Sequence, residues 1–437
     1  MRTVAVTAAA AALGLLAGMV HPLAPVALII GSWIVIGGVS SPFVTLLFFV
    51  IVLLTRPAEF VPALAPLQVA KLCALGSLGL FVLGKLIRRD VSWATSRQNR
   101  WILLLAGAVT VCSLLGTNSA MSMQIVQDVF LKILILYLLV LNLVDTPRRA
   151  IALQIAIALA DAFLGAYAIY AKVTGIATIE GSRAGAVGLL GDPNDLALTL
   201  LMGFPFLLSA FIETKGARRA AFTVLLALVF GGIIATQSRG GILGLGAGLF
   251  FLLKHRIKSK IVVYGAVGVA LVGMIAVMGV KERQGLTSSG VDESAQGRLD
   301  AWQAGLRMFK AHPLFGVGVE QFPSNYLNYV VNAVDWHQKA THNAYIQALA
   351  ETGLAGIIPF LTLLGFTVRA ASKLPKEKVP RGLEHALLSA QLPNIVGVLV
   401  SAFFLSMAWN WFLYILIAQM AAYERIYGSV SDTEIAT

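Results

Sequence analysis

A histidine and an asparagine stand side by side at residues 342 and 343, in THNAYIQALAETGLAG, directly before a long apolar segment. An imidazole in the first turn of a helix feels the positive end of the macrodipole, which lowers its pKa below about 6.5 and keeps it neutral near pH 7. Neutral imidazole is the form that accepts a proton as a general base. The pattern therefore predicts His342 as a base and Asn343 as a neighbouring substrate contact. A helix cap with a solvated histidine is the alternative.

Two arginines in other motifs are typical of anion binding. Arg239 occupies a four-residue polar break in TQSRGGILGLGAG, where Gly240 and Gly241 would expose backbone N–H groups at the start of a helix. Arg298 begins the helix-like stretch GRLDAWQAGLRMFKA. A guanidinium can form paired hydrogen bonds to phosphate oxygens, so we expect both side chains to hold phosphate. For Arg239, the alternative is a side chain that reaches the lipid headgroups.

Three further residues are candidates for substrate binding. In SRAGAVGLLGDPNDLALTL, Arg183 stands among small residues without an evident packing role and could clamp an anion. Asn194 in the same motif could instead, like Asp195, be the N-cap of the following helix. In HPLFGVGVEQF, Glu320 follows a Gly-Val-Gly sequence that indicates a turn or a close approach of two backbones.

The other patterns narrow the chemistry. His337, five residues before His342, is the second candidate for the base. The chain has no HExxH motif or comparable cluster of imidazoles and carboxylates, so we expect no catalytic metal and no cofactor. Neither a Gly-x-Ser-x-Gly nor a Ser-x-x-Lys pattern occurs, which argues against a serine nucleophile.

The elements that must position these residues are membrane helices. The chain has 437 residues, of which 58% are hydrophobic and 12% charged, and its mean hydropathy of +0.82 is far above that of soluble domains. Apolar runs long enough to cross about 30 Å of hydrocarbon recur throughout. We predict an all-α polytopic membrane protein, a bundle of about 12–14 transmembrane helices, near residues 3–20, 22–38, 41–55, 68–87, 101–116, 125–144, 150–171, 196–212, 220–236, 241–253, 261–280, 344–368, 385–406 and 409–424.

The net charge of +12 reflects basic residues in the loops between the membrane helices. Basic residues concentrate in five alternate short loops, near residues 88–100, 148–149, 215–219, 254–260 and 373–381. The positive-inside rule assigns these loops to the cytoplasm, and fourteen helices would place both termini there. No nucleic-acid partner is expected, and all the motifs above then lie on the outer face.

The chain is expected to have three parts. Residues 1–280 would form transmembrane helices with short loops, residues 281–343 a large, mainly helical outer loop or cap with its own helix around 297–311, and residues 344–437 the last transmembrane helices and a polar tail. Cys73 and Cys112 fall inside apolar spans, away from any CxxC cluster, and are interpreted as core residues.

A neutral base and two or three arginines at one membrane surface suit one reaction type. The base deprotonates a hydroxyl as it attacks an anomeric carbon, and the arginines stabilise a departing diphosphate. The donor would be lipid-linked, because soluble nucleotide sugars are not expected outside the cytoplasm. A polysaccharide or lipid transporter is the rival hypothesis, and it would use Asp128, Lys132 and Asp161 within the membrane; we interpret these three instead as a structural ion pair.

The order SRAG, GDPNDLA, TQSRGG, GRLDAW, HPLFGVGVEQF and THNAYIQALAETGLAG, over roughly residues 180 to 370, resembles the O-antigen ligase and polymerase superfamily of bacterial envelope enzymes. The resemblance implies a metal-independent, inverting glycosyltransferase that takes a glycan from undecaprenyl diphosphate at the periplasmic face of the inner membrane. It implies that Arg239 and Arg298 bind the diphosphate and that His342 activates the acceptor hydroxyl. The acceptor would be lipid A core, whereas other members extend O-antigen or exopolysaccharide or glycosylate protein.

Overall fold

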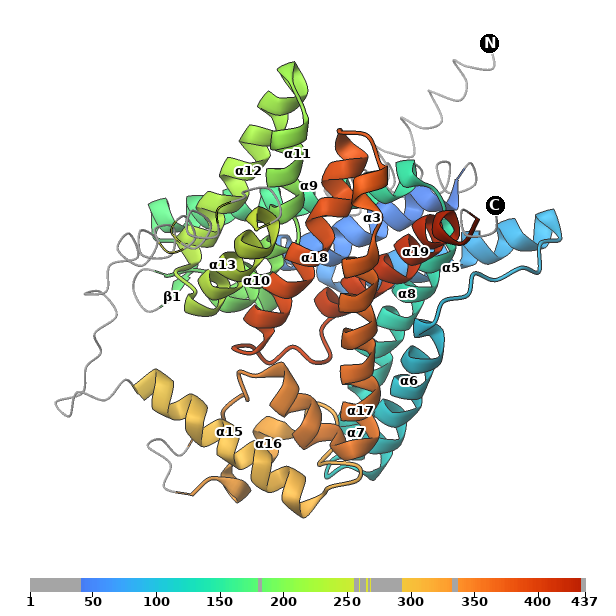
Figure 1. Ribbon diagram of the computed structural model, residues 1–437. Coiled ribbons are helices and arrows are strands. Elements are labelled where there is room, and N and C mark those ends of the chain that lie inside the picture. Colours follow the sequence, from blue (N-terminus) through green and yellow to red (C-terminus); the bar gives the residue numbers. More distant parts are fainter. Residues whose placement is uncertain are drawn as a thin grey trace, which may run out of the picture. The chain divides into compact units, whose positions relative to one another are not determined.

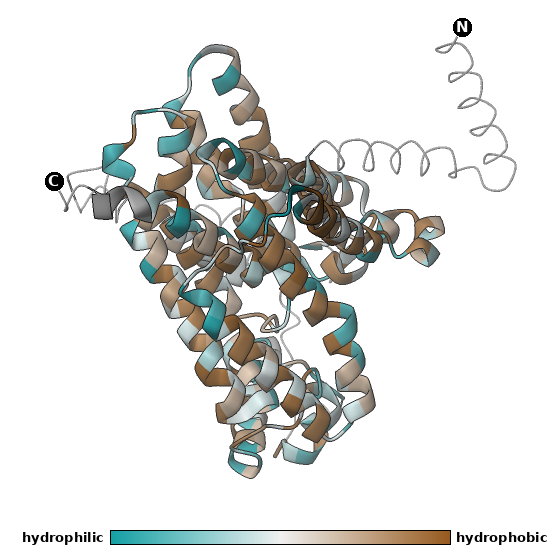
Figure 2. Cartoon of the chain, turned by 90° about the vertical axis from the view of Figure 1, so that its right-hand side faces the viewer, coloured by the Kyte–Doolittle hydropathy of each residue, from teal (hydrophilic) through white to brown (hydrophobic). Residues whose placement is uncertain are grey.

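The computed structural model describes residues 41–179, 183–254, 259, 265, 268, 293–331 and 337–433 (Figure 1). Within these ranges the regular secondary structure is helical except for one two-stranded hairpin. Eight helical segments of the described chain are long and apolar enough to cross a membrane, and α3 and α13 are shorter apolar helices. Figure 2 shows hydrophobic residues along the long helices and hydrophilic ones mainly at their ends. The predicted fold class, an all-α polytopic membrane protein, is confirmed.

The chain divides into two compact units, residues 1–93 and 94–437. In the first unit α3 packs against α5. An ion pair of 2.9 Å between Lys85 Nζ and Asp90 Oδ2 lies where α5 ends. The elements of this unit are α3 (Pro42–Thr55), α4 (Pro57–Phe60), the 3-10 helix η1 (Pro62–Leu67) and α5 (Val69–Arg88).

The second unit holds all the predicted site residues, and here α9 packs against α12, α13 against α18, and α6 against α17.

The predicted spans from residue 41 to 253 and from 344 to 424 each coincide with helices, whereas the spans predicted at 3–20, 22–38 and most of 261–280 lie outside the described residues. The elements are α6 (Gln98–Leu115), α7 (Ser119–Ile125), the π-helical turn η2 (Val126–Phe130), α8 (Leu131–Leu143), α9 (Pro147–Thr174), β1 (Thr178–Ile179), β2 (Arg183–Ala184), the 3-10 helix η3 (Gly188–Gly191), α10 (Pro193–Leu201), α11 (Phe204–Glu213), α12 (Gly216–Thr236), α13 (Arg239–Leu253), α15 (Glu293–Ala311), α16 (Phe322–Tyr329), α17 (Ala344–Lys373), the 3-10 helix η4 (Lys376–Lys378), α18 (Leu383–Ala402) and α19 (Trp411–Thr433).

The span predicted at 196–212 is broken into α10 and α11. Pro205 lacks a backbone N–H, and Gly203 lies so close to α9 that a Cβ there would be 2.6 Å from Asp161 Oδ2. Asp161 is fully buried, and neither of its carboxylate oxygens has a hydrogen-bond partner in the described part of the chain. The interpretation that Asp161 joins Asp128 and Lys132 in a structural ion pair is therefore wrong for Asp161.

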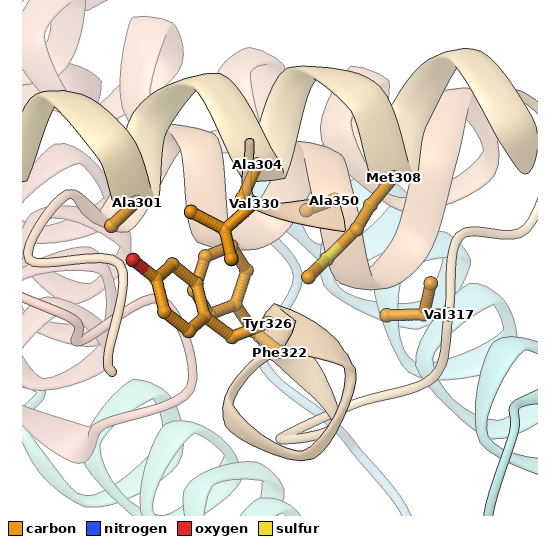
Figure 3. Packing of buried hydrophobic residues seen from close by; sticks show 8 residues of the cluster. All are labelled: Ala301, Ala304, Met308, Val317, Phe322, Tyr326, Val330 and Ala350. Carbon is orange, nitrogen blue, oxygen red and sulfur yellow. The ribbon is translucent and has the colours of Figure 1, made fainter. Parts of the chain in front are cut away.

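The helix predicted at 297–311 is α15, and it forms a small apolar core with α16 and the start of α17. In Figure 3 one face of α15 points toward α16 and the segment that precedes it. In Figure 1, α15 and α16 lie in the lower part of the picture next to the lower part of α17. The cluster consists of Ala301, Ala304 and Met308 of α15, Phe322 and Tyr326 of α16, Val317, Val330, and Ala350 of α17.

α17 is interrupted at Gly353, whose backbone (φ 55°, ψ −153°) is not helical. Residues 313–318 lie against this interruption and form hydrogen bonds with both halves of the helix. The N–H of Leu354 donates to the carbonyl of Pro313 at 2.8 Å, and that of Ala355 donates to Leu314 at 3.0 Å. A Cβ on residue 353 would lie 2.6 Å from the Leu314 carbonyl carbon. Only glycine accommodates both this positive φ and this approach.

On the N-terminal side of the interruption, the Gly-Val-Gly sequence pairs with the last carbonyls of the first half of α17. Val317 N–H donates to Ala350 O at 3.0 Å, and Gly318 N–H to Glu351 O at 2.9 Å. A Cβ on Gly316 would lie 2.3 Å from the carbonyl carbon of Glu351. The close backbone approach predicted from this sequence is confirmed, and it joins the α15–α16 connection to α17.

Candidate active site

His342 lies immediately before α17 and has a left-handed backbone, with φ of 46°. Asn343 is the N-cap of the helix, and its Oδ1 accepts from the N–H groups of Tyr345 and Ile346, both at 3.0 Å. His342 is therefore outside the helix, and its predicted place in the first turn is wrong. Ser406, in the connection between α18 and α19, accepts the His342 N–H on its Oγ at 2.7 Å.

The residue before the histidine is held from two sides. Trp302 of α15 donates its Nε1–H to the carbonyl of Thr341 at 3.0 Å. The Thr341 and Ser406 hydroxyls are hydrogen-bonded at 2.9 Å. The Trp302 ring also packs on Phe403, with 5.3 Å between ring centroids. The backbone that presents the imidazole is thus fixed by α15 and by the connection between α18 and α19.

Burial lowers the pKa of His342 below its ordinary value, and the Arg298 cation lowers it further. The Asp192 carboxylate acts in the opposite direction, and Lys339 adds a further lowering. These influences place three charged groups from separate parts of the chain within electrostatic range of the imidazole. The direction of the pKa shift agrees with the prediction, and its causes are burial and the neighbouring charges.

The loop at 183–194 is anchored to the start of α13. Asp192 is the N-cap of α10, where we expected Asn194 or the residue after it, and its Oδ1 accepts the Asn194 N–H at 2.7 Å. Asn194 Oδ1 in turn accepts from Arg183 Nη2 at 2.9 Å and from Ser238 Oγ at 2.7 Å. Arg183 also donates through Nε to the carbonyl of Thr236 at 3.4 Å. Arg183 and Asn194 thus join three segments near the site.

Arg239 is the first residue of α13, and its side chain is exposed. Ser238 is the N-cap and accepts the Gly241 N–H on its Oγ at 3.1 Å. The expectation that Gly241 offers a free N–H to phosphate is therefore wrong. Gly240 and Gly241 are buried, and a Cβ on Gly241 would lie 2.6 Å from Cβ of Ala197 in α10. These glycines allow α13 to pack closely while the guanidinium of Arg239 stays at the surface.

Glu320 belongs to a different polar network, which is centred on Glu351. The Glu351 carboxylate accepts from the backbone N–H groups of Glu320 at 2.8 Å and Phe322 at 3.2 Å, and from Trp409 Nε1 at 2.6 Å. The Glu320 side chain accepts from Gln347 Nε2 at 3.2 Å. Burial raises the pKa of Glu320, and the hydrogen bond from Gln347 opposes that shift. The contacts of Glu320 are those of a residue that holds the loop to α17.

Several residues near His342 were missed by sequence reasoning. Ser406 and His342 are 64 positions apart, and no spacing relates them. The motifs do not point to Lys339, although a cation three positions before a predicted base in the sequence can indicate a perturbed pKa at that base. His337, the second candidate for the base, is exposed, whereas His342 is half-buried. In the ranges that the structure covers, no group of three or more His, Cys, Asp or Glu side chains is placed to hold a metal ion.

Comparison with known proteins gives two matches. Residues 222–361 match the family described as O-antigen ligase, a range that includes Arg239, Arg298 and His342. The exopolysaccharide production protein ExoQ of Rhizobium meliloti (strain 1021) is 27% identical over 196 aligned positions, which cover 39% of this chain and 43% of that protein. The chain thus spans less than half the length of this relative. The matches confirm, for the segment from α12 to the middle of α17, the resemblance to the O-antigen ligase family that the motifs indicated.

Proposed function

We propose that the protein is a membrane glycosyltransferase that transfers a glycan from a lipid-linked diphosphate to an acceptor hydroxyl. The observation that carries the proposal is the environment of His342. This half-buried imidazole has a lowered pKa and a nearby Arg298 cation, and both residues lie in the segment similar to O-antigen ligases. At neutral pH it is unprotonated and can accept a proton.

In the proposed reaction the acceptor hydroxyl gives its proton to His342 while its oxygen forms a bond to the anomeric carbon. The bond between that carbon and the diphosphate oxygen breaks, and the diphosphate leaves with the bonding electrons. Attack from the side opposite the leaving group inverts the anomeric centre. Arg298 and Arg239 offer positive charge to the departing diphosphate. The proton on His342 then passes to the diphosphate or to water, which restores the base.

The effect of Arg298 on His342 suggests that donor binding strengthens the base. In the free protein the cation holds the pKa of the imidazole down. A bound diphosphate would neutralise that charge and add its own negative charge, and both effects raise the pKa of a neighbouring imidazole. The imidazole of His342 would therefore be neutral before the donor binds, and it would become more basic once the donor is bound.

The finer assignment concerns donor, acceptor and location. The family resemblance supports undecaprenyl diphosphate as the donor lipid, the periplasmic face of the bacterial inner membrane as the place of reaction, and lipid A core as the acceptor. The name of the ExoQ relative favours a second candidate, in which the acceptor is a growing exopolysaccharide and the reaction is polymerisation. Both reactions break the same bond in the donor and differ only in the acceptor hydroxyl.

The test is transfer by the purified protein in lipid vesicles, with an undecaprenyl-diphosphate glycan as donor and either lipid A core or a second donor molecule as acceptor. The key variant is His342→Asn, because asparagine tolerates the left-handed backbone at this position. We expect it to lose at least about 100-fold in rate while it unfolds at the wild-type temperature. His337→Asn is the matched control and should keep its activity.

Each failure of this experiment has a separate meaning. Full activity of His342→Asn would show that another group is the base. Transfer to neither acceptor by the wild-type protein would contradict the proposed function. A transporter would move the lipid across the vesicle membrane with the bond between glycan and diphosphate intact, so product analysis separates the two classes. Arg239→Lys and Arg298→Lys should weaken donor use, because an ammonium group cannot make the paired contact of a guanidinium.

A further inference from the structure

A cavity of about 950 Å³ lies at the opposite end of α17 from His342. Three elements of the second unit line it: residues 95–101 at the start of α6, residues 366–375 at the end of α17, and residues 421–428 of α19. Both α6 and α17 are long and apolar enough to cross a membrane. Since the cavity sits where both helices end, it lies at the boundary between hydrocarbon and water.

The polar lining of this cavity is strongly basic. Arg97, Arg100, Lys373 and Arg425 line it, against a single acidic residue, Glu424. Arg425 is anchored by a hydrogen bond of 3.2 Å to a backbone carbonyl just after α8. The side chains of the other three cations are exposed, and no hydrogen bond or ion pair to the described chain engages them. Three positive charges from two helices therefore converge without an anionic partner sufficient to balance them.

The other wall is apolar and continues onto the outer surface of α6. The rings of Trp101 and Phe366 pack with 6.4 Å between centroids and join α6 to α17. Beyond Trp101, one face of α6 presents Leu104, Val111 and Leu115, which are 57%, 41% and 61% exposed. Their spacing places them on the same side of the helix as the indole. A strip of exposed apolar side chains thus leads away from the basic cavity along the membrane-crossing helix.

We propose that this cavity binds the phosphate-bearing headgroup of an anionic phospholipid, whose acyl chains lie along the exposed strip of α6. The positive-inside rule assigns this end of the helices to the cytoplasm, where the leaflet is anionic. The cations pair with the phosphate, and the apolar wall accepts the glycerol backbone and upper chains. A water-soluble phosphate compound would satisfy the cations but leave the strip uncovered. The site shares no residue with the proposed active site and stands independently of the proposed function.

The experiment is a titration of the detergent-solubilised full chain, followed by native mass spectrometry. The probes are dioctanoyl-phosphatidylglycerol, dioctanoyl-phosphatidylcholine and glycerol phosphate. We expect the wild-type protein to bind the phosphatidylglycerol more tightly than either other probe. The variant Arg97→Gln/Arg100→Gln/Lys373→Gln should weaken that binding on the order of 100-fold, since each cation near a membrane surface contributes about one factor of five.

The matched control is Arg148→Gln/Lys215→Gln/Arg218→Gln, which removes two exposed arginines and one exposed lysine from other basic loops. We expect it to change the affinity less than about twofold. An equal loss in both variants would show general surface attraction and overturn the proposal, as would unchanged binding in the cavity variant. Equal binding of glycerol phosphate and phosphatidylglycerol would identify a soluble phosphate as the ligand and overturn the assignment to lipid. Both variants should unfold at the wild-type temperature in phosphatidylcholine, because all six side chains are exposed.

Discussion

Replacement of Glu351 should destabilise the protein in proportion to the hydrogen bonds that are lost. Its carboxylate is fully buried and accepts three N–H groups, from the backbones of Glu320 and Phe322 and from the indole of Trp409. A buried donor left without an acceptor costs about 1–3 kcal/mol. Glu351→Ala leaves three such donors and should therefore cost about 3–9 kcal/mol. In Glu351→Gln one oxygen still accepts and an NH₂ group faces a donor, so the cost should be about 1–3 kcal/mol.

The assay is thermal unfolding of the purified variants in detergent, followed by tryptophan fluorescence. From these costs we expect Glu351→Ala to unfold roughly 3 °C or more below the wild-type protein, and Glu351→Gln to show roughly a third of that shift. Thr362→Ala, on the exposed side of α17 beyond the interruption, is the control and should shift the temperature by less than about 1 °C. A wild-type unfolding temperature for Glu351→Ala would mean that the three donors find other acceptors, and it would refute the reasoning.

Three further predictions concern the site and its support. Arg298→Gln should move the acid limb of kcat/KM to higher pH, because the limb follows protonation of the base and removal of the cation raises the pKa of His342 toward its ordinary value; an unmoved limb in the pH profile would contradict this. Ser406→Ala should reduce kcat roughly tenfold and lower the unfolding free energy by about 1–3 kcal/mol, because the His342 N–H loses its acceptor; an unchanged kcat would show that this bond does not position the base. Gly241→Ala should lower the free energy of unfolding by about 1–3 kcal/mol through overpacking. Gly107→Ala on α6, where a Cβ meets nothing within 4 Å, should leave the free energy of unfolding unchanged or raise it. If chemical or thermal unfolding showed both variants to be destabilised, the packing argument would be contradicted.

The membrane helices could be predicted because hydropathy alone decides which segments leave water. The interruptions inside them could be predicted only in part. Gly353 marks a break in the sequence pattern, but the carbonyls of Pro313 and Leu314 that pair across it come from a distant part of the chain. The break before α11 combines a proline with a close contact to Asp161, and no period in the sequence encodes that contact.

Within the site, residue types were predictable and their partners were not. Arg183 was interpreted as an anion clamp, yet it donates to Asn194 and to the end of α12. The sequence does not show which hydrogen-bond partners an arginine side chain has in the folded protein. The motif places a histidine near the start of a helix, but it does not reveal the burial and the Arg298 cation that lower the pKa of His342. Such effects depend on tertiary contacts, which a local motif does not contain.

The hydrogen bonds between residues 313–318 and both halves of α17 have a consequence for chimeric proteins. Hydropathy suggests a junction at residue 343, where the long apolar segment begins. The chain cannot be divided there without loss of contacts, because Ala350 in the first half of α17 belongs to the apolar core formed with α15 and α16. The same half of α17 also accepts backbone hydrogen bonds from Val317 and Gly318. An exchange of this region between relatives should therefore take residues 293–355 as one piece, with the seam placed after Ala355, whose N–H still donates to Leu314. The unit that can be exchanged intact would then include the first turns of a membrane helix together with α15 and α16.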